Sequence, residues 1–458
     1  MKAKKILSAI AYFALALIIG IVLGIWQTRP PTADETCPAF QRMMYNIERL
    51  AVEPRVVGTE ELDRARAKII AEIEDMGLTP VVHSRRYTQE EAYSAWTRLR
   101  WSSDVPLEPL PIPYPRRRSR FDSLPDEFYV HNIFVRLEAP NSDRTIMFVS
   151  HYDSWPNSPG AADAMTPIAA MLEAMRSQAN NRTLANNIYF LMTDGEEFAA
   201  IGVLAFIQDH PELRDRIDLI VNLEAQGNSG GLILFETSPN PHSMLNVFRR
   251  AVPRPLGLSL GQTIYEAMRT YTDFNFFRQY GWRGINLAII DGHEHYHRPT
   301  DTFENLNRNT AWHYLTTTLG LADYAANNSL ERLGARPRRA IFFPFLPGNM
   351  VVISSPWIHI LRDLAIALAI TFFVYERKTK KTRVTIYSIY LLFLAALSIV
   401  ATIFVPTGEY LVWLPLLVMS VTAFLKKWIV AYRVAQLLSR ITVLLLWVPL
   451  VYLVLLVL

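Results

Sequence analysis

Long apolar stretches at both ends of the chain constrain its fold more than any other feature. Residues 6–26 contain no charged side chain, and a run of this length matches the roughly 20 residues that a helix needs to cross a bilayer. A cleaved signal peptide usually has a shorter apolar core, of about 7 to 15 residues, and a small-residue cleavage site. We therefore interpret residues 6–26 as an uncleaved membrane anchor.

The C-terminal part contains further apolar stretches. We expect about four spans there, near 356–375, 384–405, 410–425 and 441–458. The first carries Arg362 and Asp363, which are costly in lipid unless they are paired or lie near a membrane surface. A position close to one surface is the simpler interpretation.

Basic residues indicate the orientation of these spans. The N-terminus, residues 376–383 and residues 426–440 are rich in Lys and Arg, whereas residues 406–409 contain none. Short cytoplasmic loops are enriched in Lys and Arg, and five spans place all three basic segments on one side. We therefore expect a multi-pass integral membrane protein whose polar region, from residue 27 to about 350, faces away from the cytoplasm.

Charge and cysteine content exclude several function classes. Much of the net charge of +4 lies in the basic segments just described, so it does not indicate nucleic-acid binding. The basic stretch 115–120 falls in a Pro-rich region, 104–125, that we expect to be an exposed loop. Cys37 is the sole cysteine, which rules out an intrachain disulfide and argues against thiolate metal sites or thiol catalysis. A metal would have to be held by His and carboxylate side chains.

The stretch 289–299 contains the pattern H-E-x-x-H in His293, Glu294 and His297. In zincin metalloproteases this pattern binds zinc only when a helix places both imidazoles on one face. Here the strand-like run 285–290 and a turn signal at Asp291 come directly before the pattern, and Pro299 stands two residues after His297. Too few residues remain for a helix, so we reject the zincin interpretation.

Four strand-like segments in the middle region each lead into acidic or histidine residues. They are 145–150 before His151 and Asp153, 187–193 before Asp194, Glu196 and Glu197, 218–223 before Glu224, and 285–290 before the histidine cluster. Helix-like segments alternate with these strands, which predicts a mostly parallel sheet flanked by helices. Ligands in such α/β folds bind beyond the carboxyl ends of the strands, so we expect the polar side chains to meet at one edge.

Single acids after strands are usually turn or cap residues. We interpret Asp194 as a turn residue, and Asp163 taken alone could be a helix N-cap. The combined set of imidazole at His151 and His297 and carboxylate at Asp163, Glu197 and Glu224 nevertheless suits a pair of zinc ions. Cobalt or manganese could exchange for zinc at such ligands.

Four separated motifs resemble the M28 family of zinc peptidases, which includes aminopeptidases and glutamate carboxypeptidases. They are "SHYDSWPNSPGAADAM", "TDGEEFAAIG", "NLEAQGNSGG" and "YHRPTDT". Residues 52–78 are similar to the entry helix of the family and 271–281 to its pocket loop, so the resemblance covers about 36–330. Anchoring on both sides is similar to the branch of endoplasmic reticulum metallopeptidases and vacuolar membrane proteases. That resemblance implies a cytoplasmic N-terminus at 1–5, an anchor at 6–26, a peptidase domain at 35–335 and a membrane region at 336–458.

The resemblance also implies a role for each site residue. Asp163 would bridge two zinc ions, with His151 and Glu224 completing one site and Glu197 and His297 the other. Glu196 would be the general base, and Asp153 would orient His151. His293 and His295 would then be loop residues or residues that support the ligands without binding a metal. Ala164 replaces the usual Asn or Asp after the bridging residue, and Arg298 stands where Thr is common, so it could alter the pocket or bind an acidic group.

The expected function is peptide-bond hydrolysis by a membrane-anchored dizinc exopeptidase, an aminopeptidase by family resemblance. Its partners would be a peptide substrate and the lipid bilayer, without nucleic acid, and the sequence gives no indication of oligomeric state. A bacterial cell membrane is the expected location, with endoplasmic reticulum or vacuole as the alternative. The rival functions are a non-catalytic receptor or scaffold with an M28-like ectodomain, and a one-zinc enzyme similar to glutaminyl cyclase.

Overall fold

The computed structural model describes residues 24–98, 124–268, 270–333, 337–379, 391–399, 416–417 and 420–421. The chain divides into two compact units. One contains Pro30–Pro337, and the other contains Met1–Arg29 together with Arg338–Leu458. The basic stretch predicted to be an exposed loop, 115–120, lies outside the described residues.

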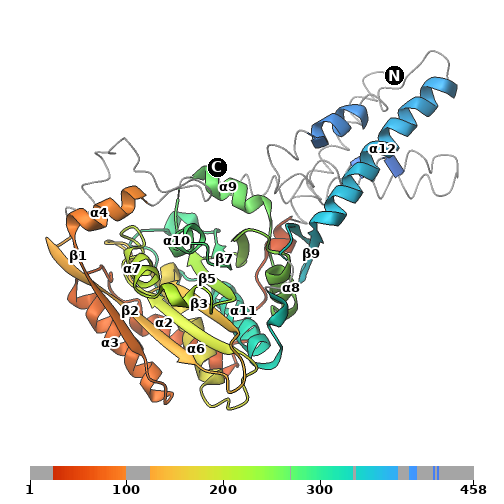
Figure 1. Cartoon of the computed structure of the whole chain (residues 1–458). Coiled ribbons are helices and arrows are strands. Elements are labelled where there is room, and N and C mark those ends of the chain that lie inside the picture. Colours follow the sequence, from red (N-terminus) through yellow and green to blue (C-terminus); the bar gives the residue numbers. More distant parts are fainter. Residues whose placement is uncertain are drawn as a thin grey trace. The chain divides into compact units, whose positions relative to one another are not determined.

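A seven-stranded mixed sheet forms the centre of the Pro30–Pro337 unit, in the order β1-β2-β4-β3-β5-β7-β6 (Figure 1). Its four middle strands run parallel: β4 (Asn187–Thr193), β3 (Thr145–His151), β5 (Leu219–Ala225) and β7 (Gly284–Ile289). Every residue of these strands is buried, as expected for nearly continuous apolar runs covered on both faces. The predicted α/β fold with a parallel centre is confirmed.

Antiparallel strands complete the two edges of this sheet. They are β1 (Val81–Thr88) and β2 (Glu127–Leu137) on one side and β6 (Ile233–Thr237) on the other. In β1, most side chains are exposed or half-buried and three of them are basic or histidine, which fits an edge strand with one wet face.

The direction of the crossovers places helices on both faces of the sheet. Helix α6 (Thr166–Gln178) leads from β3 to β4, whereas α7 (Ile201–Asp209) leads from β4 back past β3 to β5. Because such crossovers are right-handed, two that run in opposite directions put their helices on opposite faces. Helices α2 (Pro38–Leu50) and α11 (Arg308–Asn327) pack with α6, and α10 (Asp273–Gln279) packs with α7 (Figure 1).

Local sequence explains the helices that cover the sheet. In α3 (Glu60–Asp75), Thr59 caps the N-terminus, the first turn carries three acids, and Leu62, Ala65, Ile69 and Ile73 form a buried stripe. The remaining helices are α4 (Gln89–Arg98), α8 (His242–Ala251), α9 (Leu260–Met268) and short 3₁₀ helices at Pro211–Leu213, His293–His295, Phe303–Asn305 and Glu331–Leu333. Strand β3, where the strand order reverses, is the point at which ligands bind in folds of this type.

The second unit contains a hairpin and a long helix. Strands β8 (Ala340–Leu346) and β9 (Asn349–Ser354) pair antiparallel and lead into α12 (Ser355–Thr379). Within the described residues, Ser355–Tyr375 is the one helical stretch long and apolar enough to cross a membrane, and it coincides with the predicted span 356–375. Inside it, Arg362 and Asp363 form an ion pair at 2.9 Å, so neither charge stands alone.

Helix α12 packs against the helical residues 391–399 through small and apolar side chains. The buried cluster that they form together with Leu416 contains Ala365, Ala369, Phe372, Leu391, Leu394 and Ala395. Small residues of this kind allow close packing between helices in lipid. The predicted spans at 6–26, 384–405, 410–425 and 441–458 lie wholly or largely outside the described residues.

Candidate metal centre

The five predicted ligands come together at the carboxyl ends of the parallel strands. His151 is the last residue of β3, Glu224 lies near the end of β5, and Glu197 follows β4. Asp163 lies in the segment Ala161–Met165 that precedes α6; its φ of −109° and ψ of 90° are not helical, and the peptide bond to Ala164 is cis. His297 follows β7 by way of the 3₁₀ turn His293–His295. Side chains far apart in the sequence therefore meet because neighbouring parallel strands end at the same edge.

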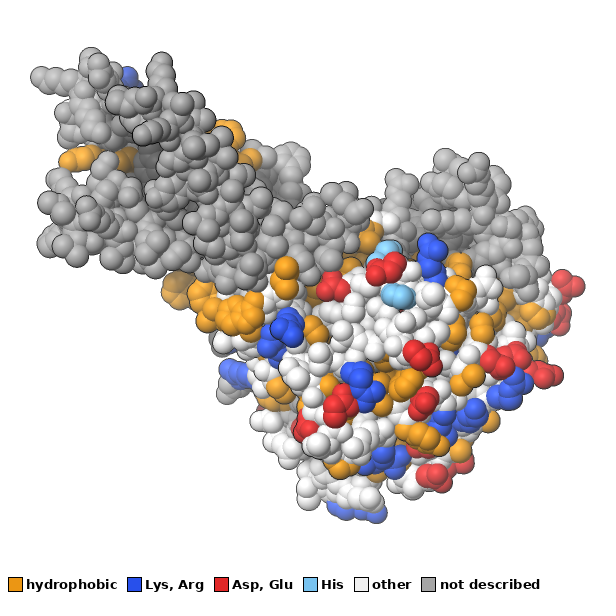
Figure 2. Space-filling view, turned by 180° about the vertical axis from the view of Figure 1, so that it is seen from behind, with side chains coloured by type: hydrophobic (Ala, Val, Ile, Leu, Met, Phe, Trp, Pro, Cys, Tyr) orange, Lys and Arg blue, Asp and Glu red, His pale blue; other side chains and the backbone are white. Residues whose placement is uncertain are grey.

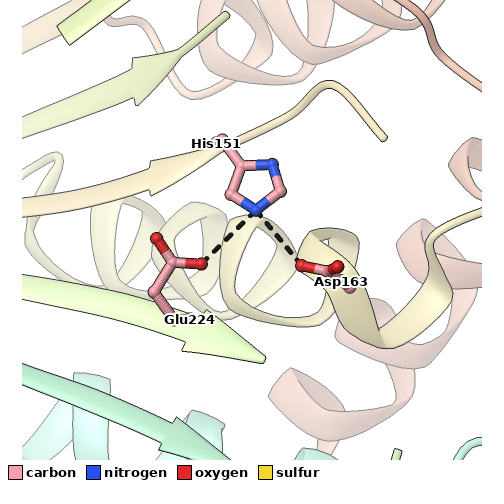
Figure 3. Close-up of side chains that lie close together, drawn as sticks. All are labelled: His151, Asp163 and Glu224. Atoms are coloured by element: carbon pink, nitrogen blue, oxygen red, sulfur yellow. Dashed lines mark ion pairs between the residues drawn. The ribbon is translucent and has the colours of Figure 1, made fainter. Parts of the chain in front are cut away.

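One cluster consists of His151, Asp163 and Glu224 (Figure 3). The Nε2 atom of His151 lies 3.2 Å from Asp163 Oδ1 and 3.4 Å from Glu224 Oε2. All three side chains are buried, and the imidazole points between the two carboxylates in the close-up view.

A second cluster shares Asp163 with the first. The Nε2 atom of His297 lies 3.3 Å from Asp163 Oδ2 and 3.0 Å from Glu197 Oε2. Each oxygen of Asp163 thus belongs to a different cluster, which is the arrangement that a carboxylate bridging two cations requires.

The spacing and chemistry of these atoms fit zinc. A tetrahedral zinc ion with bonds near 2.0 Å holds its ligand atoms roughly 3.3 Å apart, and the four separations between histidine nitrogens and carboxylate oxygens range from 3.0 to 3.4 Å. Glu197 Oε1 is buried and has no hydrogen-bond partner among the described residues, a costly state that a cation would relieve. The residues present therefore fit a pair of ions, with Asp163 between them.

Mutual charge dominates the protonation of these side chains. Burial alone would lower the pKa of His297, but the carboxylates of Glu197 and Asp163 raise it to about 9. Burial would also lower the pKa of His151, but the charge of Glu224 outweighs it, so this pKa is raised well above its ordinary value. Burial would raise the pKa of Asp163, yet the two histidines lower it to about 2. The protonation of each histidine therefore depends on the charge of the neighbouring carboxylates, and the protonation of Asp163 depends on the two histidines.

Glu196 lies beside the clusters but belongs to neither. Its side chain is buried, and burial together with the charge of Glu224 raises the pKa of the Glu196 carboxyl well above its ordinary value. Glu196 and Glu197 are adjacent in sequence but differ in position, since only Glu197 contacts His297. The environment of Glu196 is that of a group suited to accept and release a proton.

Asp153 contacts both a histidine and the paired glutamates. Its Oδ1 lies 3.4 Å from His151 Nδ1, and its backbone oxygen lies 3.1 Å from the same nitrogen. Its two carboxylate oxygens also accept the backbone N–H groups of Glu196 and Glu197, each at 3.2 Å. The family resemblance implied the contact between Asp153 and His151, whereas nothing in the sequence indicated the bonds to the backbone of the two glutamates.

The remaining histidines of the cluster make other contacts. Nδ1 of His293 lies 2.8 Å from the backbone oxygen of Gln226, and Nδ1 of His295 lies 3.1 Å from that of Thr300. Neither side chain belongs to the two carboxylate clusters. Because residues 293–295 form a 3₁₀ helix rather than an α-helix, the rejection of the zincin interpretation is supported by the structure.

Aromatic rings hold the imidazole of His297. The Trp155 ring stacks on it with a centroid distance of 4.3 Å and an interplanar angle of 6°, and the Tyr296 ring stacks at 3.7 Å. His297 has a φ of 57°, a left-handed conformation uncommon for residues other than glycine. Local backbone strain of this kind is tolerated where surrounding contacts fix the residue.

Two buried charges that sequence reasoning missed support the loops of the site. Arg55 is 1% exposed, and its guanidinium donates to the backbone oxygens of Tyr152, Pro159 and Gly160. Asp301 accepts the backbone N–H groups of Ala162 at 2.9 Å and Asp163 at 3.2 Å. Burial raises the pKa of Asp301 to about 7. Asp301 stands in the motif "YHRPTDT", which could have marked it.

Asp194 has the structural role expected from its turn position. Its Oδ2 accepts the backbone N–H of His131 at 2.8 Å, and its own N–H donates to Asn132 Oδ1 at 3.0 Å. These bonds fasten the loop after β4 to the neighbouring strand β2.

Comparison with known proteins agrees with these features. The family model described as Peptidase family M28 matches residues 132–322. Residues 132–322 therefore match an M28 peptidase domain. All five clustered side chains, Glu196 and Asp153 fall within the matched segment.

Relatives of the M28 domain include membrane proteases of eukaryotes. The vacuolar membrane protease of Candida glabrata is 30% identical over 229 residues, which cover 49% of this chain and 23% of the relative. That of Saccharomyces cerevisiae strain S288c is 28% identical over 264 residues, covering 56% and 26%. A putative endoplasmic reticulum metallopeptidase 1-B of Caenorhabditis elegans is 27% identical over 260 residues, covering 55% and 29%. The matches thus span less than a third of each relative.

Solved structures with a similar fold include an aminopeptidase from Aneurinibacillus sp. strain AM-1. It is 14% identical with a TM-score of 0.48, and the match covers 63% of this chain and 93% of that one. BSAP, a zinc aminopeptidase from Bacillus subtilis, is 16% identical with a TM-score of 0.44, covering 64% and 96%. Fimbriiglobus ruber glutaminyl cyclase is 14% identical with a TM-score of 0.45, covering 64% and 97%.

Proposed function

We propose that this chain is a membrane-anchored dizinc metallopeptidase that removes N-terminal residues from peptides outside the cytoplasm. One observation carries the proposal. Asp163 Oδ1 lies 3.2 Å from His151 Nε2 and Asp163 Oδ2 lies 3.3 Å from His297 Nε2, and each histidine has one further carboxylate beside it. A single ion would need one such cluster. Two clusters that share a carboxylate support two ions, held by His151, Glu224 and Asp163 on one side and by His297, Glu197 and Asp163 on the other.

The residues of the chain divide the remaining tasks of amide hydrolysis. A bound pair of zinc ions would supply an activated water and polarise the scissile carbonyl. Glu196 would take a proton from the attacking water and pass it to the leaving amine, a contribution of roughly a hundred- to ten-thousandfold in rate. Asp153 would hold His151 in place and fix the backbone of the two glutamates through the hydrogen bonds described above.

Membrane anchoring is supported by α12 and by the apolar stretches outside the described residues. The names of the relatives, vacuolar membrane protease and putative endoplasmic reticulum metallopeptidase, also support it. Acidic and basic side chains are interspersed on the face of the molecule seen in Figure 2, an arrangement unlike the single-sign basic surface that binds nucleic acid. A peptide remains the proposed substrate.

Two other functions compete with this proposal. A non-catalytic receptor or scaffold would have no need for the two carboxylate clusters beside the buried Glu196, so their presence supports an enzyme. An enzyme similar to glutaminyl cyclase would hold one zinc ion. The number of ions per chain separates that alternative directly.

Metal content and peptide hydrolysis together test the proposed function. The full chain, purified in mild detergent, should contain about two zinc ions and should hydrolyse peptides with a free N-terminus but not N-acetylated ones. Removal of the metal with a chelator should abolish hydrolysis, and added zinc should restore it. One ion per chain with cyclisation of N-terminal glutamine, or two ions without hydrolysis of any peptide, would contradict the proposal.

A further inference from the structure

A cavity of about 590 Å³ opens beside the second cluster. It is lined by Pro54, Pro156, Asn157, Tyr296, His297, Arg298 and Pro299. His297 belongs both to this lining and to the carboxylate cluster that contains Asp163. A molecule bound in the cavity would therefore extend to the atoms at which the proposed reaction takes place. The volume falls within the range of roughly 300 to 1,000 Å³ that is usual for small-molecule sites.

Prolines and backbone hydrogen bonds restrain the walls of this cavity. Three of its lining residues are prolines, whose ring fixes the backbone angle φ. The backbone N–H of Arg298 donates to the oxygen of His295, and the oxygen of Arg298 accepts from Asp301 N–H at 3.0 Å. A loop fixed in this way places the side chains of Tyr296 and Arg298 without the need for a large rearrangement on binding.

Arg298 gives the cavity a positive charge. Its side chain is exposed, and no ion pair or side-chain hydrogen bond joins its guanidinium to another residue in the described part of the chain. Apart from His297, which already contacts Asp163 and Glu197, the other lining side chains are apolar or neutral. A guanidinium that pairs with no described residue, in a cavity lined by no carboxylate among those residues, is suited to bind an anionic group through two parallel hydrogen bonds.

We propose that this cavity is a substrate subsite in which Arg298 binds a carboxylate of the peptide. The inference rests on the proposed peptidase function and adds a class of substrate to it: peptides that carry an acidic group next to the scissile bond. Two sources would supply the same chemistry. One is the side chain of an acidic residue, and the other is the free C-terminus of a dipeptide.

Three matched pairs of dipeptides distinguish these sources. Each pair differs in one carboxylate: Asp-Ala amide against Asn-Ala amide, Ala-Asp amide against Ala-Asn amide, and Ala-Ala with a free carboxyl terminus against Ala-Ala amide. For the native chain with its metal bound, at least one acidic member should be cleaved with kcat/KM about tenfold above its neutral partner. The pair that shows the preference identifies which carboxylate the cavity binds.

Variants at position 298 assign the preference to the side chain. Arg298→Gln should reduce the preference to less than about threefold, chiefly through KM, because an interaction with a group that does not itself react acts equally on the bound substrate and on the transition state. Arg298→Lys keeps the charge but loses the planar pair of donors, so it should retain part of the preference. Arg250→Gln, at an exposed position on α8 outside the cavity, is the control for a lost surface charge and should behave as the native chain.

Equilibrium binding provides a readout that does not depend on turnover. Calorimetry on the chelator-treated chain should give a dissociation constant about tenfold lower for the acidic peptide than for its neutral partner, and Arg298→Gln should remove this difference. An equal rate and equal binding within all three pairs would overturn the subsite, as would a preference that survives Arg298→Gln. If no peptide is cleaved but the acidic one still binds through Arg298, the peptidase proposal fails while the carboxylate site stands.

Discussion

Glu196 and Glu197 are identical in chemistry and adjacent in sequence, yet the structure gives them different surroundings. Glu197 Oε2 lies 3.0 Å from His297 Nε2, whereas Glu196 is buried beside the clusters without belonging to either. Their backbone N–H groups are held by the two oxygens of one carboxylate, Asp153. A difference in position of this kind should separate a proton acceptor from a ligand.

Glutamine substitutions test that separation. Glu196→Gln keeps the shape of the side chain and removes its basic charge, so both ions should remain while the rate falls by roughly a hundred- to ten-thousandfold or more. Glu197→Gln removes an anionic ligand, so one ion should weaken or leave, and excess zinc should restore part of the activity. Metal analysis and kinetics on both variants check this. Loss of metal from Glu196→Gln alone would reverse the two roles, and full activity in both would contradict peptidase function altogether.

The histidines offer a second comparison between neighbours. His297→Ala should lower the metal content and abolish hydrolysis, because the imidazole contacts two of the carboxylates. His293→Ala and His295→Ala should leave the metal content near normal, since both side chains bond to backbone oxygens instead. Metal analysis of the three variants decides the matter. An equal loss of metal from His293→Ala would show that the 3₁₀ turn does not describe the working site.

Among the helices, α11 depends on a neutral histidine. His313 is buried; its Nδ1 accepts the backbone N–H of Leu232 at 3.0 Å, and its Nε2 lies 3.0 Å from the backbone oxygen of Arg254. Burial lowers the pKa of His313 to about 4, compared with roughly 6.5 for an unfolded chain. Between these two values the unfolded state binds a proton that the native state does not, so stability falls as the pH falls from about 6.5 towards 4.

The size of this effect can be measured by substitution. Between pH 7 and pH 5, protonation of the unfolded His313 should cost about 2 kcal/mol of unfolding free energy. His313→Gln cannot titrate, so it should be less stable at pH 7 but should lose about 2 kcal/mol less than the native chain over this interval. Urea denaturation of both proteins at the two pH values, at equal metal content, gives the comparison. Identical pH dependence in the two proteins would show that His313 is not buried in its neutral form.

The sequence could predict those parts of the fold that are formed by continuous apolar stretches. The strands β3, β4, β5 and β7 are apolar and end in polar residues, so both their identity and their shared edge could be inferred. Edge strand β1 could not be predicted, because it is rich in basic residues and pairs with β2, which comes much later in the chain. Arg55 and Asp301 were missed for a similar reason: they act on backbone groups of distant loops, which no pattern of neighbouring side chains reveals.

At the scale of the whole chain, orientation in the membrane is the main expectation still to be measured. The basic segments near residues 380 and 430 should lie in the cytoplasm and the short turn near 407 on the other side, because Lys and Arg are retained on the cytoplasmic side. Reporters that are active on one side only, inserted at these three positions, check the arrangement. A reporter at 380 that is active outside the cytoplasm would exclude the five-span topology.

The order of the strands along the chain is also the order in which the ligands of the two clusters are synthesised. During synthesis, the three side chains of the first cluster are complete once β5 has been made, whereas His297 is added only after β7. The second cluster can therefore close around an ion only after nearly the whole domain has been synthesised. With the orientation proposed above, we expect the zinc to come from the pool of the outer compartment, so that the supply of metal there, rather than in the cytoplasm, limits how many finished chains become active.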